Sequence, residues 1–104
     1  MINRFGLTDD VIEKIQHVLS QFPDIKSVIL YGSRAKGNYK TGSDIDLSLK
    51  TNNTISDRLL FRVISALDDL DLPYTFDVSL FEQIDNVDLR EHIDRVGVDF
   101  FRAK

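Results

Sequence analysis

Two aspartates, Asp44 and Asp46, stand one residue apart in the segment DIDLSLK, residues 44–50. Polar and apolar residues alternate along this segment, as they do along a half-buried β-strand, so both carboxylates are expected on the face opposite the core. Aspartate is a poor strand former, and its charge is costly to bury without a partner. Two carboxylates roughly 7 Å apart along one strand could hold a hard cation together.

A third aspartate, Asp77, lies in another alternating segment, YTFDVSLF, residues 74–81. If the two strands lie side by side, Asp77 adds a third carboxylate to the pair. Oxygen donors in a chain with no cysteine and two histidines favour Mg²⁺ or Mn²⁺ over zinc. The alternative is that Asp44 caps a turn and that all three carboxylates face solvent on an uncovered sheet face.

A glycine turn precedes the paired aspartates. Gly32 and Ser33 directly follow IKSVILY, residues 25–31, whose β-branched residues predict a buried strand. Backbone N–H groups and a hydroxyl in such a turn can surround a phosphate. Arg34 and Lys36 come next, and they either neutralise phosphates or solvate the loop. Together the turn, the bases and the carboxylates describe a site for a metal-bound triphosphate.

The same residues resemble a known signature. Gly32-Ser33, ten intervening residues and Asp44-Ile45-Asp46 resemble the GS-x10-DxD pattern of the nucleotidyltransferase superfamily that includes DNA polymerase beta. The longer string YGSRAKGNYKTGSDIDL resembles the small bacterial and archaeal members, the minimal nucleotidyltransferases (MNT). These are typically encoded beside a HEPN-domain protein as a toxin–antitoxin pair. The motif covers 16 residues, and the order of predicted elements agrees over nearly the whole chain.

The resemblance implies a role for each matching residue. Gly32 and Ser33 would bind the triphosphate of ATP. Asp44 and Asp46 would coordinate two Mg²⁺ ions, with Mn²⁺ as the other candidate. Asp77 matches the third carboxylate, which binds the catalytic metal and helps to deprotonate an acceptor hydroxyl.

The resemblance also implies a reaction and a partner. An MNT protein silences a HEPN toxin by transferring AMP from ATP to a tyrosine of the toxin, with release of pyrophosphate. In this chain, Arg34 and Lys36 would join Gly32 and Ser33 as nucleotide-binding residues. Two alternatives stay open. The protein could be a non-catalytic antitoxin that neutralises a HEPN partner by contact, or an enzyme that nucleotidylates a small molecule. A homo-oligomer is compatible with the sequence.

The surrounding elements must hold these residues in place. Thr8, followed by two acids, predicts the start of a helix whose apolar residues recur at helical spacing as far as Phe22. After the strands at 25–31 and 44–50, an apolar stripe predicts a second helix before the strand at 74–81. A last helix is expected at 87–96, with Leu89, Ile93 and Val96 inward, before a short strand at VDFF.

This order of elements predicts an α/β (α+β) fold with a small mixed sheet and about three helices, in a single domain over residues 1–104. The connection from the second strand through a helix to the third predicts a parallel crossover. The resemblance implies the nucleotidyltransferase fold.

The composition of the chain disfavours nucleic-acid-binding and membrane-spanning proteins. The 104 residues carry a net charge of −4 and no basic stripe, so no direct nucleic-acid binding is expected. No apolar run approaches the ~20 residues of a membrane span, and the first residues lack the apolar core of a signal peptide. The absence of cysteine fits a reducing cytoplasm, where we expect the protein.

Overall fold

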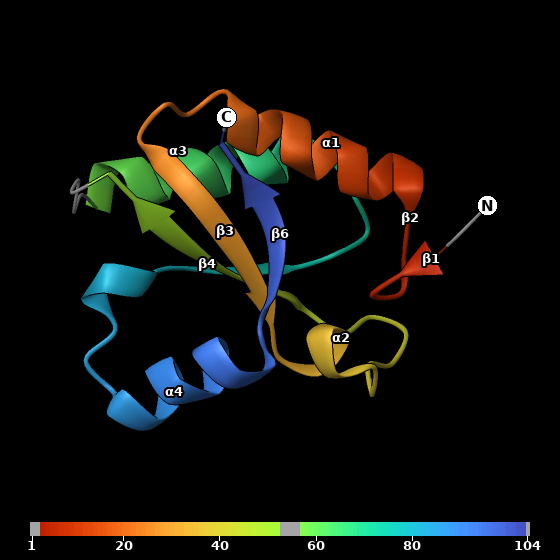
Figure 1. Cartoon of the computed structure of the whole chain (residues 1–104). Coiled ribbons are helices and arrows are strands. Elements are labelled where there is room, and N and C mark those ends of the chain that lie inside the picture. Colours follow the sequence, from red (N-terminus) through yellow and green to blue (C-terminus); the bar gives the residue numbers. More distant parts are fainter. Residues whose placement is uncertain (1–2, 53–56, 104) are drawn as a thin grey trace.

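A four-stranded mixed sheet forms the centre of the structure (Figure 1), a computed structural model that describes residues 3–52 and 57–103. Its strands are β3 (Ile25–Tyr31), β4 (Ile45–Thr51), β5 (Phe76–Leu80) and β6 (Val98–Arg102), in the spatial order β5-β4-β3-β6. β3 pairs antiparallel with β4 and with β6, whereas β4 and β5 run parallel. The parallel pair confirms the crossover that the sequence predicts.

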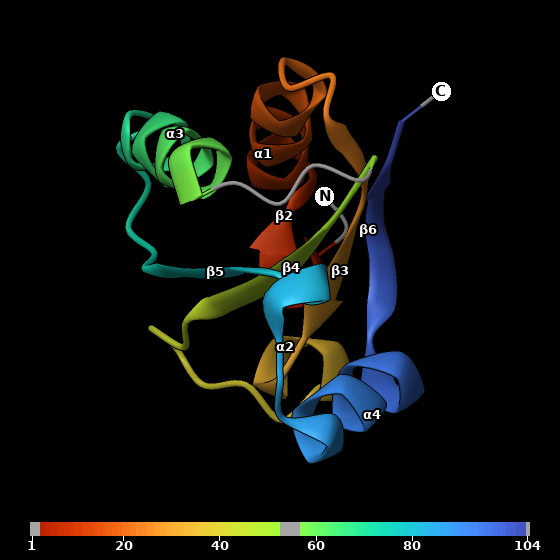
Figure 2. The same ribbon diagram turned by 90° about the vertical axis from the view of Figure 1, so that its left-hand side faces the viewer.

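Helices lie on both faces of this sheet (Figure 2). α1 (Asp9–Ser20) and α3 (Asp57–Asp68) pack together on one face, and α4 (Val87–Val96) lies on the other, after the 3₁₀ helix η1 (Phe81–Gln83). The predicted cap of α1 is confirmed, because the hydroxyl of Thr8 accepts a hydrogen bond from the Val11 amide at 3.2 Å. None of the described helices is long and apolar enough to cross a membrane.

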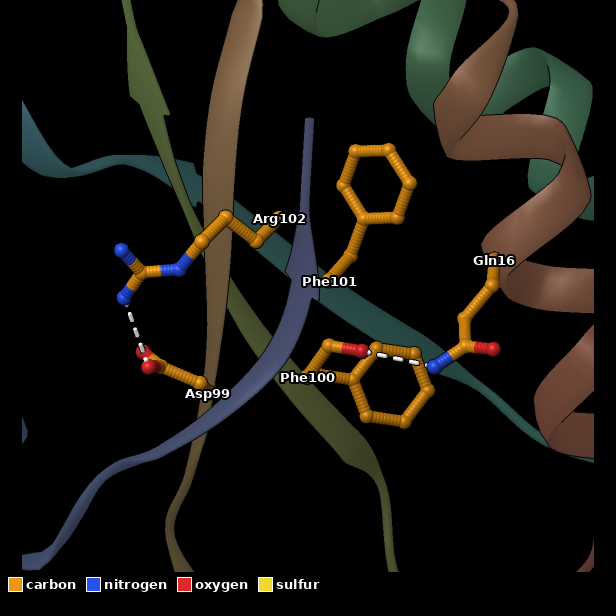
Figure 3. Close-up of a pocket in the computed structure, with 5 residues that line it drawn as sticks. All are labelled: Gln16, Asp99, Phe100, Phe101 and Arg102. Atoms are coloured by element: carbon orange, nitrogen blue, oxygen red, sulfur yellow. Dashed lines mark hydrogen bonds and ion pairs between the residues drawn. The ribbon is translucent and has the colours of Figure 1, made fainter. Parts of the chain in front are cut away.

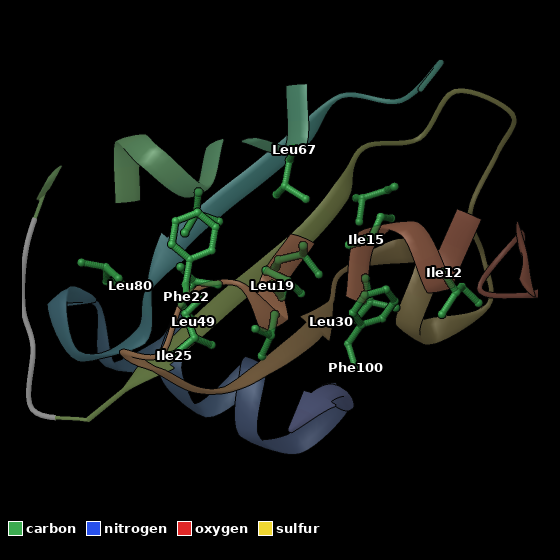
Figure 4. Close-up of a cluster of buried hydrophobic side chains, with 14 of the residues drawn as sticks. Ile12, Ile15, Leu19, Phe22, Ile25, Leu30, Leu49, Leu67, Leu80 and Phe100 are labelled. Carbon is green, nitrogen blue, oxygen red and sulfur yellow. The ribbon is translucent and has the colours of Figure 1, made fainter. Parts of the chain in front are cut away.

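The main core lies between the sheet and the α1–α3 face (Figure 4). Ile45, Leu47 and Leu49 of β4 are each 0% exposed, which confirms the predicted apolar face of the alternating segment. The helices fill the other side of this core with side chains that recur at helical spacing: Ile12, Ile15, Leu19, Leu59, Val63 and Leu67.

A second, smaller cluster covers part of the opposite sheet face. It joins Ile29 and Tyr31 of β3, Phe81 of η1 and Ile93 of α4. The cluster covers the sheet face near β3, whereas of the three carboxylates in the alternative interpretation Asp44 and Asp77 are exposed and Asp46 is half-buried. The prediction that Leu89 points inward is wrong, because its side chain is 37% exposed and α4 reaches the cluster through Ile93.

Two short elements at the chain's beginning were not predicted from the sequence. β1 (Asn3–Arg4) and β2 (Leu7–Thr8) form an antiparallel hairpin, and each has two residues, too few to show an alternating pattern. The turn between them places Phe5 at φ 59° and Gly6 at φ 73°. Positive φ at both central residues is typical of the tight turns that match strand twist.

The edge strand β6 contacts α1 through Gln16, whose side chain points toward Phe100 (Figure 3). Its register against β3 shifts between Val28 and Ile29, as at a β-bulge. The side-chain amide of Gln16 donates to the Phe100 carbonyl at 2.8 Å beside a surface hollow. Because Asp44 lies just before β4 and Asp46 lies on it, whereas this hollow lies along β6, the hollow belongs to a different part of the molecule.

Replacing Leu47 by alanine tests the placement of the core. We expect the free energy of unfolding to fall by about 3 kcal/mol, because the substitution leaves a cavity at a fully buried site. Urea denaturation followed by circular dichroism measures the loss. Leu89→Ala removes the same atoms from an exposed side chain and is expected to cost less than about 1 kcal/mol. Equal losses in the two variants would contradict the assignment of Leu47 to the core.

Candidate active site

The register of two parallel strands brings Asp46 and Asp77 together. Asp46 of β4 and Asp77 of β5 are direct partners in the ladder, although 30 residues separate them in the sequence. Partners in adjacent strands project from the same face, about 4.8 Å apart. Asp46 is half-buried and Asp77 is exposed. The condition under which Asp77 could add a third carboxylate, that its strand lies beside that of Asp46, is therefore met.

The glycine turn touches this pair. Gly32 directly follows β3 with φ 76°, and a methyl group added at its Cα would collide with the Asp46 carboxylate. The short helix α2 (Ser33–Lys36) starts directly after it, where the Lys36 amide donates to the Gly32 carbonyl at 3.1 Å. The tertiary structure thus places the predicted phosphate-binding turn in contact with a predicted metal ligand.

Asp44 lies just before β4 and is exposed. Among residues 3–52 and 57–103, no three His, Cys, Asp or Glu side chains already form a metal-binding group. The structure therefore does not gather Asp44, Asp46 and Asp77 into a complete metal site; it brings Asp46 and Asp77 into register, and the three carboxylates still offer oxygen donors. Such a donor set fits Mg²⁺, which usually keeps several waters and binds through one or two carboxylates and substrate phosphates.

Negative charge accumulates at Asp46. Burial, and after it the charges of Asp77 and Asp44, together raise the pKa of this carboxyl to about 6, while the nearby positive charge of Arg34 opposes them. Each of the first three causes disfavours the ionised form. A bound cation would favour that form, which agrees with a role of these carboxylates as metal ligands.

Tyr31 is a residue of this site that sequence analysis missed. It pairs with Asp46 across the antiparallel β3–β4 ladder, and its ring lies in the smaller hydrophobic cluster. Burial raises the pKa of the Tyr31 hydroxyl, a hydrogen bond with Ser79 lowers it, and the charges of Asp77 and Asp46 raise it. The sequence contains no local motif for this placement, because it depends on which strand residues face each other.

The two bases after the turn differ in their surroundings. Lys36 is exposed, so it remains available to a phosphate. Arg34 is 3% exposed, and its guanidinium donates to the backbone carbonyls of Phe5 and Ser43. The alternative that Arg34 simply solvates the loop is wrong.

Comparison with known proteins gives a consistent result. The sequence profile described as polymerase beta, nucleotidyltransferase matches residues 13–104. A toxin–antitoxin complex with AMP-PNP has a chain with a TM-score of 0.72 and 20% identity, over 89% of this chain and 74% of that chain. The toxin–antitoxin complex MntA–HepT gives a TM-score of 0.68 and 17% identity, over 92% and 74%.

A third solved structure is the tri-AMPylated HEPN toxin of Shewanella oneidensis in complex with MNT antitoxin. Its TM-score is 0.66 at 18% identity, over 89% of this chain and 71% of that chain. No curated protein sequence matches significantly. At such identities, the likeness to solved structures establishes a shared nucleotidyltransferase fold.

Two glycine substitutions test the contact between the turn and Asp46. Gly32 and Gly37 both have positive φ, but a methyl group on Gly37 would meet nothing within 4 Å. We expect Gly37→Ala to cost about 1–2 kcal/mol of unfolding free energy through backbone strain. Gly32→Ala should cost at least about 3 kcal/mol, because strain and collision with Asp46 add. Thermal unfolding of both variants measures these losses of stability. Equal losses in Gly32→Ala and Gly37→Ala would contradict the contact between Gly32 and Asp46.

The raised pKa of Asp46 predicts a pH-dependent gain in stability for Asp46→Asn. Because the folded carboxyl has a pKa of about 6, above its ordinary value, the folded state binds the proton more tightly than the unfolded chain does. The contribution of the protonated Asp46 carboxyl to the stability of the wild-type fold is therefore present at low pH. It is lost as the pH rises through about 6 and this carboxyl ionises. The asparagine variant should unfold at a higher temperature than wild type at pH 8 and at a similar one at pH 4.

Thermal unfolding in EDTA measures this difference across the pH range. Asp24→Asn makes the same change at an exposed aspartate just before β3, and it should show no such trend. A difference between Asp46→Asn and wild type that stayed constant from pH 4 to pH 8 would contradict the assigned burial and charge repulsion.

Proposed function

The chain belongs to the polymerase beta nucleotidyltransferase family, and on that premise we propose that it is a Mg²⁺-dependent nucleotidyltransferase that acts as an antitoxin. In this proposal it transfers AMP from ATP to a tyrosine of a partner HEPN toxin. Structures of the same fold include a toxin–antitoxin complex with AMP-PNP and a tri-AMPylated HEPN toxin with MNT antitoxin, which supports this nucleotide and this partner.

The observation that carries the proposal is the in-register pair of Asp46 and Asp77, with the backbone of Gly32 packed against Asp46. A nucleotidyltransferase needs carboxylates beside the point where the triphosphate is held. Ser33 follows Gly32 at the start of α2, so its hydroxyl and the turn amides are proposed to bind the phosphates.

The proposed reaction is a displacement at phosphorus. The acceptor tyrosine oxygen attacks the α-phosphorus of ATP, the bond from that phosphorus to the bridging oxygen of the β-phosphate breaks, and pyrophosphate leaves. Asp77 is exposed beside Asp46, which supports the proposal that its carboxylate takes the phenolic proton. Lys36 is exposed on α2 and would neutralise phosphate charge. When bound by Asp44, Asp46 and Asp77, Mg²⁺ would offset the negative charge of the triphosphate.

An open site favours a protein as the acceptor. α4 reaches the sheet at β3 through Ile93, while Asp44 and Asp77 at β4 and β5 are exposed. A tyrosine on the surface of another protein can therefore approach them. Residues 53–104 carry eleven acids against six Lys/Arg, so a partner with a basic surface would be steered toward this half of the chain.

The double substitution Asp44→Asn/Asp46→Asn tests the catalytic assignment. We expect it to abolish transfer of label from ATP labelled at the α-phosphate to a co-purified HEPN partner, because two of the three proposed metal ligands lose their charge. Gel autoradiography and intact mass measurement of the partner report the transfer. Asp24→Asn/Asp85→Asn changes two exposed aspartates elsewhere and serves as the control.

The outcomes separate the alternatives. Labelling by the Asp44/Asp46 variant at the wild-type rate would show that these carboxylates do not hold the metal. A variant that transfers nothing but still protects cells that express the toxin would show neutralisation by contact. Wild-type protein that labels a small molecule and leaves the HEPN partner unmodified would show a different acceptor.

A further inference from the structure

We propose that Arg34 is a positioning residue that ties the glycine turn, the loop before Asp44 and the N-terminal hairpin into one unit. This inference rests on the proposed function for its effect on nucleotide transfer. Arg34 was expected to contact phosphate, but its guanidinium contacts the protein's own backbone instead.

Each of the three guanidinium nitrogens of Arg34 donates to a backbone carbonyl, and the two acceptors lie in separate parts of the chain. Nη1 donates to the Phe5 carbonyl at 2.8 Å. Nη2 and Nε donate to the Ser43 carbonyl at 2.8 Å and 3.2 Å. These contacts span 29 and nine residues of sequence, so one side chain joins three separate segments.

Two aromatic rings enclose the same group. The Cζ atom of Arg34 lies 5.5 Å from the ring centroid of Tyr39 and 5.1 Å from that of Tyr74. Arginine stacks on aromatic faces through its planar, weakly hydrated head. The side chain is 3% exposed, and within the described residues it forms no ion pair with a carboxylate. Such a buried cation depends on these carbonyls and rings for the interactions that replace water.

The partners of Arg34 are themselves tightly arranged. A methyl group added to Gly6 would lie 2.5 Å from the Tyr39 ring and 2.8 Å from Arg34 Nη1, so the hairpin turn packs directly on the stacked groups. Ser43 closes a turn with Lys40, since its amide donates to the Lys40 carbonyl at 3.0 Å and its hydroxyl accepts from the Lys40 amide at 2.8 Å. Arg34 therefore binds a turn that is already closed.

The position of Arg34 in the sequence gives these contacts a consequence for the site. Arg34 directly follows Ser33, and Ser43 directly precedes Asp44. The guanidinium thus fixes the distance between the proposed phosphate-binding turn and the first proposed metal ligand. Catalytic groups must be held within a fraction of an ångström of their working positions, and a displacement of about 1 Å costs on the order of 100-fold in rate.

Arg34→Lys tests the inference, because lysine keeps the positive charge but has no planar fork for two carbonyls. Amide hydrogen exchange, read by mass spectrometry without nucleotide, should become at least about tenfold faster in residues 38–44. The rate of AMP transfer at saturating ATP should fall about 100-fold. The dissociation constant of ATP, measured by calorimetry, should change less than about threefold, since lysine still supplies the charge.

Arg102→Lys is the matched control, because it makes the same replacement at a side chain that is 71% exposed. Tyr39→Leu removes one stacked ring from an exposed side chain and should raise exchange in the same loop even if Arg34→Lys fails to fold. Unchanged exchange in Tyr39→Leu, or in a folded Arg34→Lys, would overturn the inference. A loss of ATP affinity in Arg34→Lys with an unchanged transfer rate would also overturn it, in favour of phosphate binding.

These readouts keep the two proposals apart. A wild-type protein that transfers no nucleotide refutes the proposed function. The exchange measurements then still decide whether Arg34 orders the loop.

Discussion

The pairing of β4 with a neighbour on each side is the constraint on which the site depends. β4 meets β3 in antiparallel register and β5 in parallel register, so Asp46 lies between Tyr31 and Asp77 in one row across the sheet. A shift of either ladder by one residue would turn the facing side chain to the other face. The buried Ile45, Leu47 and Leu49 oppose such a shift, because it would expose them to solvent.

The same register brings the negative charge of Asp77 next to the partly buried carboxyl of Asp46. Burial and two neighbouring carboxylates disfavour the ionised form of Asp46. An apolar or amide side chain at this position would carry no charge and would avoid this cost. Strain of this kind is common at functional sites, where a local arrangement lowers stability and serves chemistry instead. Gly32 belongs to this arrangement, because the Asp46 carboxylate fills the space that a larger residue would need.

The loops around the sheet are held by a different interaction. Arg34 is buried among backbone carbonyls and two tyrosine rings, and it joins the hairpin at Phe5 with the turn at Ser43. On the opposite side, α4 fixes β3 through the cluster that contains Ile93 and Tyr31. These contacts hold β3 and the loop before Asp44, while Asp44 and Asp77 themselves stay exposed.

The sequence by itself determined the features that follow local periodicity. Alternation placed the apolar residues of 44–50 in the core, Thr8 capped α1, and the GS-x10-DxD pattern indicated the nucleotidyltransferase family. Tertiary structure alone decided that Asp77 faces Asp46, that Arg34 is buried and that Leu89 is exposed. The physical reason is that the direction of a side chain depends on its own backbone. Its neighbours and its burial depend on segments that are distant in the sequence and meet when the chain packs.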